Sequence, residues 1–203
     1  METVVLCFSP VVERQMLRKM MEDYSAKLDS VRGLGLPPHI TLVSRFKTER
    51  LSELKKEVVS VCENIRPFSI RADHIGAFED SGLAAIHFEK NEDLQNVHEK
   101  MLKLVSQYRE PWVRDKLAEV EKNTRQKELT EKYGSPFVME YFNAHLSLTG
   151  ADVNKEKLEH LKLPKPFALT LNVDRVHILR KVGEEWKFDA EIFLEKSPEP
   201  KTA

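Results

Sequence analysis

The sequence predicts an α+β fold of two similar lobes, with two antiparallel sheets facing a central cleft and helices on the outer faces. Strand-like and helix-like segments follow the same order in the two halves of the chain. Each half also contains one strand whose side chains alternate between polar and apolar. The 203 residues, of which 41% are hydrophobic and 32% charged, suffice for one large domain with a substantial core.

The first half shows alternating β and helical patterns. Its first strand is rich in β-branched and aromatic residues and stops at Ser9-Pro10, and Gly33-Leu34-Gly35 marks the end of the helix that follows. Pro37-Pro38 then leads into an alternating strand. The predicted strand, helix, strand, helix and strand span residues 3–8, 11–28, 39–46, 51–65 and 67–78.

The second half repeats this order. Asn91 is a suitable N-cap for its first helix, and a hairpin that turns at Val182-Gly183 closes the chain. Asp73-His74 in the first half matches Asp174-Arg175 in the second. The alternative to a true internal repeat is chance similarity between short β segments. The predicted strand, helix, strand, helix and hairpin strands span residues 83–88, 91–108, 141–149, 155–161, 167–179 and 186–194.

We expect residues 1–196 to form a single domain with a helical insertion at about 110–136, followed by a disordered tail at 197–203. The insertion is densely charged over 114–133 and carries both signs, which favours a solvated helix whose possible apolar anchors are Leu117, Val120, Leu129 and Tyr133. A lid or a grip on RNA beyond the reacting group is the alternative.

Bulk properties exclude several classes of protein. A formal net charge of −1 argues against broad coating of nucleic acid. The two cysteines, Cys7 and Cys62, fall in a predicted strand and a predicted helix, which favours burial over a disulfide framework. The chain has neither a basic leader nor an apolar stretch long enough to span a bilayer, so we expect a monomer of the cytosol or nucleus without membrane partners.

The chemistry is predicted by one pattern that occurs twice. The first motif is His39-Ile40-Thr41-Leu42 and the second is His145-Leu146-Ser147-Leu148. Because side chains two apart on a strand share a face, each histidine shares its face with the hydroxyl, and the apolar residues face the core. We therefore expect two histidines and two hydroxyls to line a cleft between the lobes.

Such a cleft suits hydrolysis of a phosphodiester by in-line displacement. One imidazole can deprotonate water while the other protonates the departing ribose oxygen, and the hydroxyls can donate to the non-bridging oxygens. No metal or cofactor is needed. The alternative is two half-buried strand histidines with a structural role, because a single His-x-Ser/Thr match carries little information.

The paired motifs resemble the signature of the 2H phosphoesterase superfamily over nearly the whole chain, and look most like its plant and fungal cyclic phosphodiesterases. The resemblance implies that His39, Thr41, His145 and Ser147 are catalytic. It implies hydrolysis of a nucleoside or RNA-terminal 2′,3′-cyclic phosphate, or of ADP-ribose 1″,2″-cyclic phosphate, with a 2′-phosphate as the expected product. A tyrosine that often follows the second motif in this branch, near Gly150, is absent.

Two alternatives to this function stay open. One is cleavage or joining of 2′,5′-linked RNA or oligoadenylate at the same site, and the other is a non-catalytic RNA-binding module with the same cleft. The expected partner is a cyclic nucleotide or an RNA 3′ end. Neither the residue that acts as base nor the position of the product phosphate follows from the sequence.

Strand parity also nominates neighbours of the motifs. Arg45, with Val43, falls on the His39 face and could hold a phosphate; Tyr141 and Asn143 fall on the His145 face, where Tyr141 could stack on a base. For Arg45 and Tyr141 an ordinary position on the rim is the alternative. The other five histidines lack a following hydroxyl and ligand-like spacing, which favours structural or surface roles: His74, His87, His98, His160 and His177.

Overall fold

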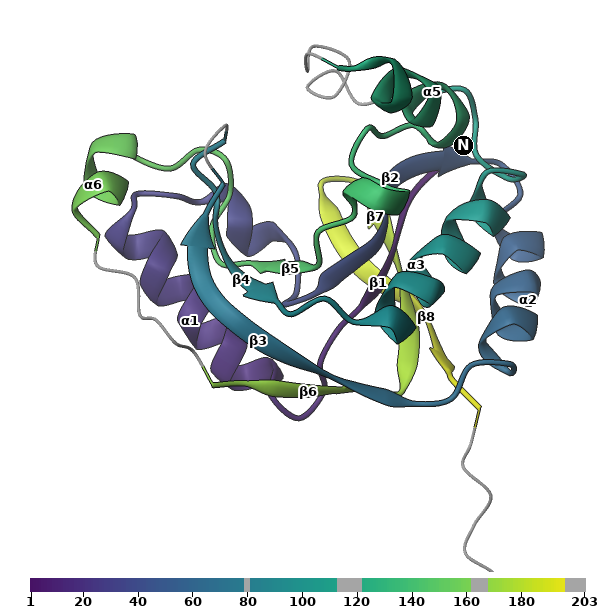
Figure 1. The fold of residues 1–203 in the computed structure, drawn as a ribbon, viewed down its shortest axis with the longest axis horizontal. Helices are drawn as coiled ribbons and strands as arrows, with labels where there is room; N and C mark the ends of the chain where they lie inside the picture. Colours follow the sequence, from purple (N-terminus) through teal and green to yellow (C-terminus); the bar gives the residue numbers. More distant parts are fainter. Residues whose placement is uncertain (79–80, 113–121, 162–167, 196–203) are drawn as a thin grey trace, which may run out of the picture.

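The strands form one curled antiparallel sheet (Figure 1). The computed structural model describes residues 1–78, 81–112, 122–161 and 168–195. In this part of the chain the sheet has eight strands. Their order across the sheet is β6 (Thr170–Val173), β3 (Phe68–Ala77), β4 (Ala84–Phe88), β5 (His145–Ser147), β2 (Ile40–Thr48), β1 (Glu2–Phe8), β7 (Arg175–Val182) and β8 (Glu185–Phe193).

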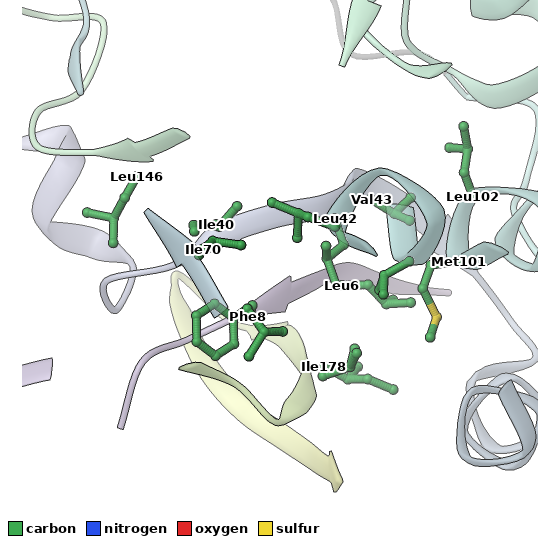
Figure 2. Close-up of a cluster of buried hydrophobic side chains, with 14 of the residues drawn as sticks. Leu6, Phe8, Ile40, Leu42, Val43, Ile70, Met101, Leu102, Leu146 and Ile178 are labelled. Atoms are coloured by element: carbon green, nitrogen blue, oxygen red, sulfur yellow. The ribbon is translucent and has the colours of Figure 1, made fainter. Parts of the chain in front are cut away.

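Three helices pack against the sheet and bury its apolar face. They are α1 (Arg14–Lys27), α2 (Leu51–Cys62) and α3 (Glu92–Val105), and the apolar positions of each recur at helical spacing. As the sequence predicts, Asn91 caps α3, because its side-chain oxygen accepts from the backbone N–H of Leu94 at 2.8 Å. Their buried side chains join those of the strands in one cluster (Figure 2).

The remaining helices are short. They are α5 (Thr124–Tyr133), α6 (Lys155–His160) and the 3-10 helices η1 (Arg32–Gly35) and η2 (Met139–Tyr141). The helix α5 belongs to the predicted insertion, but it is not solvated on all sides, since Leu129 and Tyr133 are buried in the core. Two predicted segments lie outside the described residues. They are the charged part of the insertion at 113–121 and the tail at 197–203.

The α+β class is confirmed, and the two expected sheets are the two halves of one sheet. The strands β2 and β5 hydrogen-bond to each other in the middle, where Ile40 pairs with Leu146. Outward from this pair the order is β5, β4, β3 on one side and β2, β1, β7 on the other, in agreement with the sequence repeat. The two segments that the repeat matches also make similar contacts. The Asp73 carboxylate lies 2.9 Å from His74 Nδ1, and the Asp174 carboxylate binds Arg175.

Two predicted strands differ from the observed ones. The segment predicted at 167–179 divides at Asp174 into β6, which pairs with β3, and β7, which pairs with β1, so this part of the chain crosses from one half of the sheet to the other. The strand predicted at 141–149 is also shorter, since residues 139–141 form η2 and only β5 is extended.

Both cysteines are buried and free, as expected, and burial raises the pKa of the Cys62 thiol to about 12. None of the helices in the described ranges combines the length and the apolar character that crossing a bilayer requires.

Candidate active site

The two motifs lie side by side in the middle of the sheet. Since Ile40 of β2 pairs with Leu146 of the antiparallel β5, the same register places His39 opposite Ser147 and Thr41 opposite His145. His39 immediately precedes β2, and His145 begins β5. Segments far apart in the sequence thus bring two imidazoles and two hydroxyls together on adjacent strands.

The predicted alternation within the motifs is confirmed. Ile40 and Leu146 are fully buried, and Leu42 and Leu148 are buried beside them, whereas both histidines and both hydroxyl residues are half-buried. Figure 2 shows Ile40, Leu42 and Leu146 among the buried apolar side chains. Complete burial of such a side chain contributes about 1.5–3 kcal/mol, so the core holds the opposite, polar face of these strands in place.

Both motif histidines are held in the same way. Nδ1 of His39 lies 2.8 Å from the carbonyl oxygen of Pro37, and Nδ1 of His145 lies 2.8 Å from the carbonyl oxygen of Asn143. A carbonyl oxygen only accepts hydrogen bonds, so Nδ1 carries the proton in each neutral ring. Nε2 is then the nitrogen that accepts or releases a proton in each ring.

Burial makes both imidazoles harder to protonate. Loss of hydration lowers the pKa of His39, and the hydrogen bond to Pro37 opposes this shift. Burial likewise lowers the pKa of His145, and positive charge on His39 lowers it further. Protonation of His39 therefore disfavours protonation of His145.

Aromatic rings flank His145. Phe78 meets it edge-on at 4.8 Å between ring centroids and also contacts His87 at 4.9 Å, and His87 stacks on His74 at 4.7 Å with nearly parallel rings. The register explains this row, because His145 pairs with His87 and His87 pairs with His74. Gly76 makes room for it, since a Cβ there would lie 2.9 Å from Nε2 of His74.

The other predicted site residues have different surroundings. Arg45 places its guanidinium 4.9 Å from the centroid of the Trp186 ring. Asn143 supplies the carbonyl for His145, and its side chain is exposed. Tyr141 lies in η2, outside any strand, and its hydroxyl accepts from the amide of Asn123 at 3.2 Å, so strand parity does not place it beside His145.

Val43 corrects the parity argument for the first motif. It is buried in the core and does not share the face of His39, because the register between β1 and β2 shifts at this point. Cys7 pairs with Thr41 but Leu6 pairs with Val43, so β2 contains one extra residue and its alternation changes phase.

Of the five histidines outside the motifs, His160 is exposed and the other four divide into two groups. His98 and His177 are buried, and His98 is fully bonded: its Nδ1 donates to the Leu42 carbonyl at 2.6 Å and its Nε2 accepts from the Met139 N–H at 3.1 Å. These two hydrogen bonds connect Leu42 of the first motif with Met139, which lies in the segment before the second motif. His74 and His87 instead border the site, and sequence reasoning missed them because only the register of β3, β4 and β5 brings them there.

The arrangement provides two proton-carrying nitrogens and two hydroxyl donors for one substrate group. Across the described ranges no cluster of three or more histidine, cysteine, aspartate or glutamate side chains is set to hold a metal ion.

Comparisons with known proteins identify the family of the chain. A family model described as the 2'-5' RNA ligase superfamily matches residues 12–185. No curated protein sequence matches the chain.

Solved structures share the fold over almost the full length. E. coli LigT complexed with 3'-AMP is 13% identical, with a TM-score of 0.58, and the match covers 96% of this chain and 99% of that one. TT0787 of Thermus thermophilus is 15% identical, with a TM-score of 0.56 and coverage of 96% and 98%. A structure described as a phosphoesterase is 13% identical, with a TM-score of 0.55 and coverage of 96% and 99%.

At such identities the structures show the common fold, whereas the family model spans most of the sequence and includes both motifs. The chain therefore belongs to the 2'-5' RNA ligase superfamily, the 2H phosphoesterases.

Proposed function

We propose that the protein hydrolyses the 2′,3′-cyclic phosphate of a nucleoside or an RNA 3′ end, without a metal ion, by general acid and base catalysis with His39 and His145. One observation carries the proposal: the two histidines lie on adjacent antiparallel segments, and each has its Nδ1 bound to a backbone carbonyl. Binding alone does not need two proton carriers held in the same tautomer.

Each imidazole has one task in this reaction. Nε2 of one histidine takes a proton from water, whose oxygen attacks phosphorus and forms the new P–O bond. The bond from phosphorus to one ribose oxygen breaks on the opposite side, and Nε2 of the other histidine gives that oxygen its proton. The ring is opened and one phosphate monoester remains, for which we expect the 2′ position.

Thr41 and Ser147 stabilise the charge that develops during this step. Both share the face of the histidines, and each hydroxyl can donate a hydrogen bond to a non-bridging phosphate oxygen. Together the four side chains supply base, acid and charge stabilisation, so the proposed mechanism contains no step that calls for a metal or a cofactor.

Two finer points belong to the same proposal. ADP-ribose 1″,2″-cyclic phosphate contains the same five-membered cyclic phosphate and is the second candidate substrate. Arg45 and Asn143 are candidates for substrate contacts, because Arg45 is a cationic residue of β2, the strand that follows His39, and the Asn143 carbonyl binds His145.

Cleavage or joining of 2′,5′-linked RNA is the second candidate function. The name of the matching family and the similarity to LigT favour it, and it uses the same acid, base and donors. A non-catalytic RNA-binding module is the third reading, which the retention of both complete motifs argues against.

A panel of substrates in EDTA separates these functions. We expect turnover of 2′,3′-cyclic AMP and of RNA that ends in a 2′,3′-cyclic phosphate, and slower or no turnover of 2′,5′-oligoadenylate. Turnover of the oligoadenylate alone would assign the second function, and absence of all turnover would leave a binding module. Loss of activity in EDTA that a divalent ion restores would contradict the metal-free mechanism.

A further inference from the structure

The segment that precedes the first motif has unusual bonding limits. Proline has no backbone N–H, so Pro37 and Pro38 can be held by hydrogen bonds only through their carbonyl groups. The Pro37 carbonyl accepts from Nδ1 of His39 at 2.8 Å, and the Pro38 carbonyl accepts from the Ser9 hydroxyl at 2.7 Å. The position of the acceptor for His39 therefore depends on what holds the neighbouring carbonyl.

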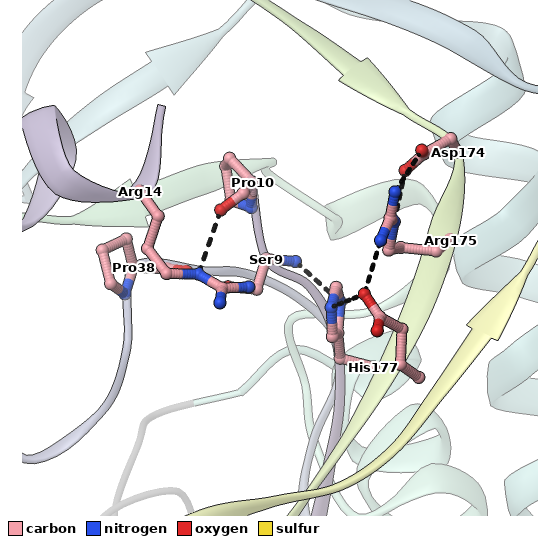
Figure 3. Close-up of polar contacts among 8 residues, drawn as sticks. Ser9, Pro10, Arg14, Pro38, Asp174, Arg175 and His177 are labelled. Atoms are coloured by element: carbon pink, nitrogen blue, oxygen red, sulfur yellow. Dashed lines mark hydrogen bonds and ion pairs between the residues drawn. The ribbon is translucent and has the colours of Figure 1, made fainter. Parts of the chain in front are cut away.

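Ser9 is a fully buried polar residue beside His39. It follows the last residue of β1, and because Phe8 pairs with Ile40, the same register places Ser9 opposite His39. The backbone N–H of Ser9 donates to Nδ1 of His177 at 3.2 Å (Figure 3). Both donors of Ser9 are thus used, one toward the proline segment and one toward β7.

His177 is a fixed acceptor for Ser9. It is buried, and burial lowers its pKa to about 4, so the ring is neutral near pH 7 and Nδ1 keeps its lone pair. Nε2 then carries the proton and lies 3.4 Å from the Glu191 carboxylate, which Arg175 binds at 2.6 Å. Arg175 is bound in turn by Asp174 (Figure 3).

We propose that Ser9 is a positioning residue for His39. The Ser9 hydroxyl fixes the Pro37-Pro38 segment, so that the Pro37 carbonyl holds the Nδ1 proton of His39 and Nε2 of His39 stays directed to the substrate. The kinetic part of this inference rests on the proposed function, whereas the effect on the ring of His39 does not.

The ring of His39 can be observed directly by ¹⁵N NMR of the imidazoles in the full chain. In the wild type we expect the Nδ1–H tautomer. In Ser9→Ala the Pro38 carbonyl loses its donor, so we expect a mixture of both tautomers and a lower pKa of His39, while His145 is unchanged. Ser9→Thr keeps the hydroxyl and is expected to restore the wild-type spectrum of His39.

Ser135→Ala is the matched control for removal of a buried serine hydroxyl. Ser135 is 3% exposed, and its hydroxyl accepts from the backbone N–H of Phe137, which belongs to neither motif. We expect this variant to keep the wild-type tautomer of His39. An unchanged His39 tautomer and pKa in folded Ser9→Ala, or the same change in Ser135→Ala, would overturn the proposal.

Kinetics give a second readout on a 2′,3′-cyclic substrate. Misplacement of a reacting group by a fraction of an ångström lowers the rate of the chemical step, so we expect kcat of Ser9→Ala to fall roughly 10- to 100-fold with KM nearly unchanged. A rise in KM at constant kcat would overturn the positioning role. If the wild type turns over no substrate, the proposed function fails, while the NMR measurement still decides whether Ser9 sets the state of His39.

A second variant covers the case in which Ser9→Ala fails to fold. Ser9→Cys keeps only a weak donor, so we expect an intermediate mixture of His39 tautomers. A wild-type spectrum of Ser9→Cys would count against the proposal.

Discussion

His39 and His145 both donate Nδ1–H to the carbonyl of the residue two positions earlier in the chain. This hydrogen bond sets the tautomer before any substrate arrives, so neither ring has to reorganise during proton transfer. At the scale of single residues, the site is therefore defined by backbone carbonyls as much as by the side chains of the motifs.

The pH dependence of kcat/KM follows from the lowered pKa values of both histidines. The base acts only above its pKa and the acid only below its own, and both values lie below the ordinary value of about 6.5. Both limbs of the bell-shaped profile therefore move toward acid, and we expect the maximum of kcat/KM below about pH 6.5. A profile that still rises above pH 7.5 would contradict this assignment.

Thr41 and Ser147 can be tested separately from the histidines. Thr41→Val and Ser147→Ala each remove one proposed donor to the phosphate, and we expect kcat to fall about 10²-fold per variant, by analogy with removal of one oxyanion donor. Thr41→Ser and Ser147→Thr retain the hydroxyl and serve as controls with activity near wild type. Equal losses in the hydroxyl-retaining variants would point to altered packing and not to lost donation.

Strand parity predicted the orientation of the four motif residues correctly because it needs only the two-residue repeat of a strand over a few positions. The same rule is wrong for Val43, where a bulge shifts the phase, and it does not apply to Tyr141, which lies in a 3-10 helix. His87 was not predicted to border the site because its position depends on pairing between strands, which local sequence does not reveal.

At the scale of elements, α3 joins the two motif segments. His98 on α3 bonds the Leu42 carbonyl of β2 and the Met139 N–H of η2, and its ring stacks on Phe142 at 3.9 Å between centroids. These tertiary bonds compete with the strand propensity of residues 139–144, and they explain why β5 begins only at His145.

His98→Phe tests this connection. The variant keeps an aromatic ring for stacking but leaves one buried C=O and one buried N–H without partners, so we expect the free energy of unfolding to fall by about 2–5 kcal/mol. Urea denaturation followed by circular dichroism measures it. His160→Phe, at an exposed position of α6, is the control, with an expected change within about 0.5 kcal/mol. A similar small change for His98→Phe would show that α3 is not an essential connection.

The positions of α1, α2 and α3 were predicted because apolar residues recur at helical spacing in each, but the predicted ranges 11–28, 51–65 and 91–108 are each three or four residues too long. The segment at 167–179 was predicted as one strand, although its apolar alternation changes phase at Asp174-Arg175, from Leu171 and Val173 to Val176 and Ile178. The partners of the two resulting strands, β3 for β6 and β1 for β7, are distant in the sequence, and local sequence does not reveal such pairing.

At the scale of the whole molecule, one sheet carries both motifs in its two central strands. The sequence repeat predicted equivalent strands in the two halves of the chain, but not their neighbours in the sheet: β3 of the first half lies beside β4, and β7 of the second half lies beside β1. It did not predict that β2 and β5 would pair directly, because either arrangement of two lobes buries the same apolar faces.

Buried neutral histidines also link global stability to pH. Burial and the nearby Arg14 and Arg175 lower the pKa of His177, and Glu191 opposes this shift only in part. The unfolded chain binds a proton at a pKa of about 6.5, so stability is present above this value and is lost as pH falls toward about 4. The contribution of His177 is roughly 3 kcal/mol over this range.

Chemical denaturation between pH 7 and pH 4.5 measures this linkage. We expect His177→Gln, whose side chain can still accept from the Ser9 N–H but does not titrate, to lose clearly less stability over this interval than the wild type. Parallel declines in the two proteins would show that His177 is not responsible.

The account rests on two histidines that act together on one phosphate, and a double-mutant cycle tests this most directly. The rates of 2′,3′-cyclic AMP opening are measured in EDTA for His39→Asn, His145→Asn and the double variant, with ³¹P NMR of the product. We predict that each single variant loses at least about 10³-fold in kcat and that the double variant loses little more, because the two groups work as a unit. A single variant with nearly wild-type activity, or losses that multiply in the double variant, would contradict it.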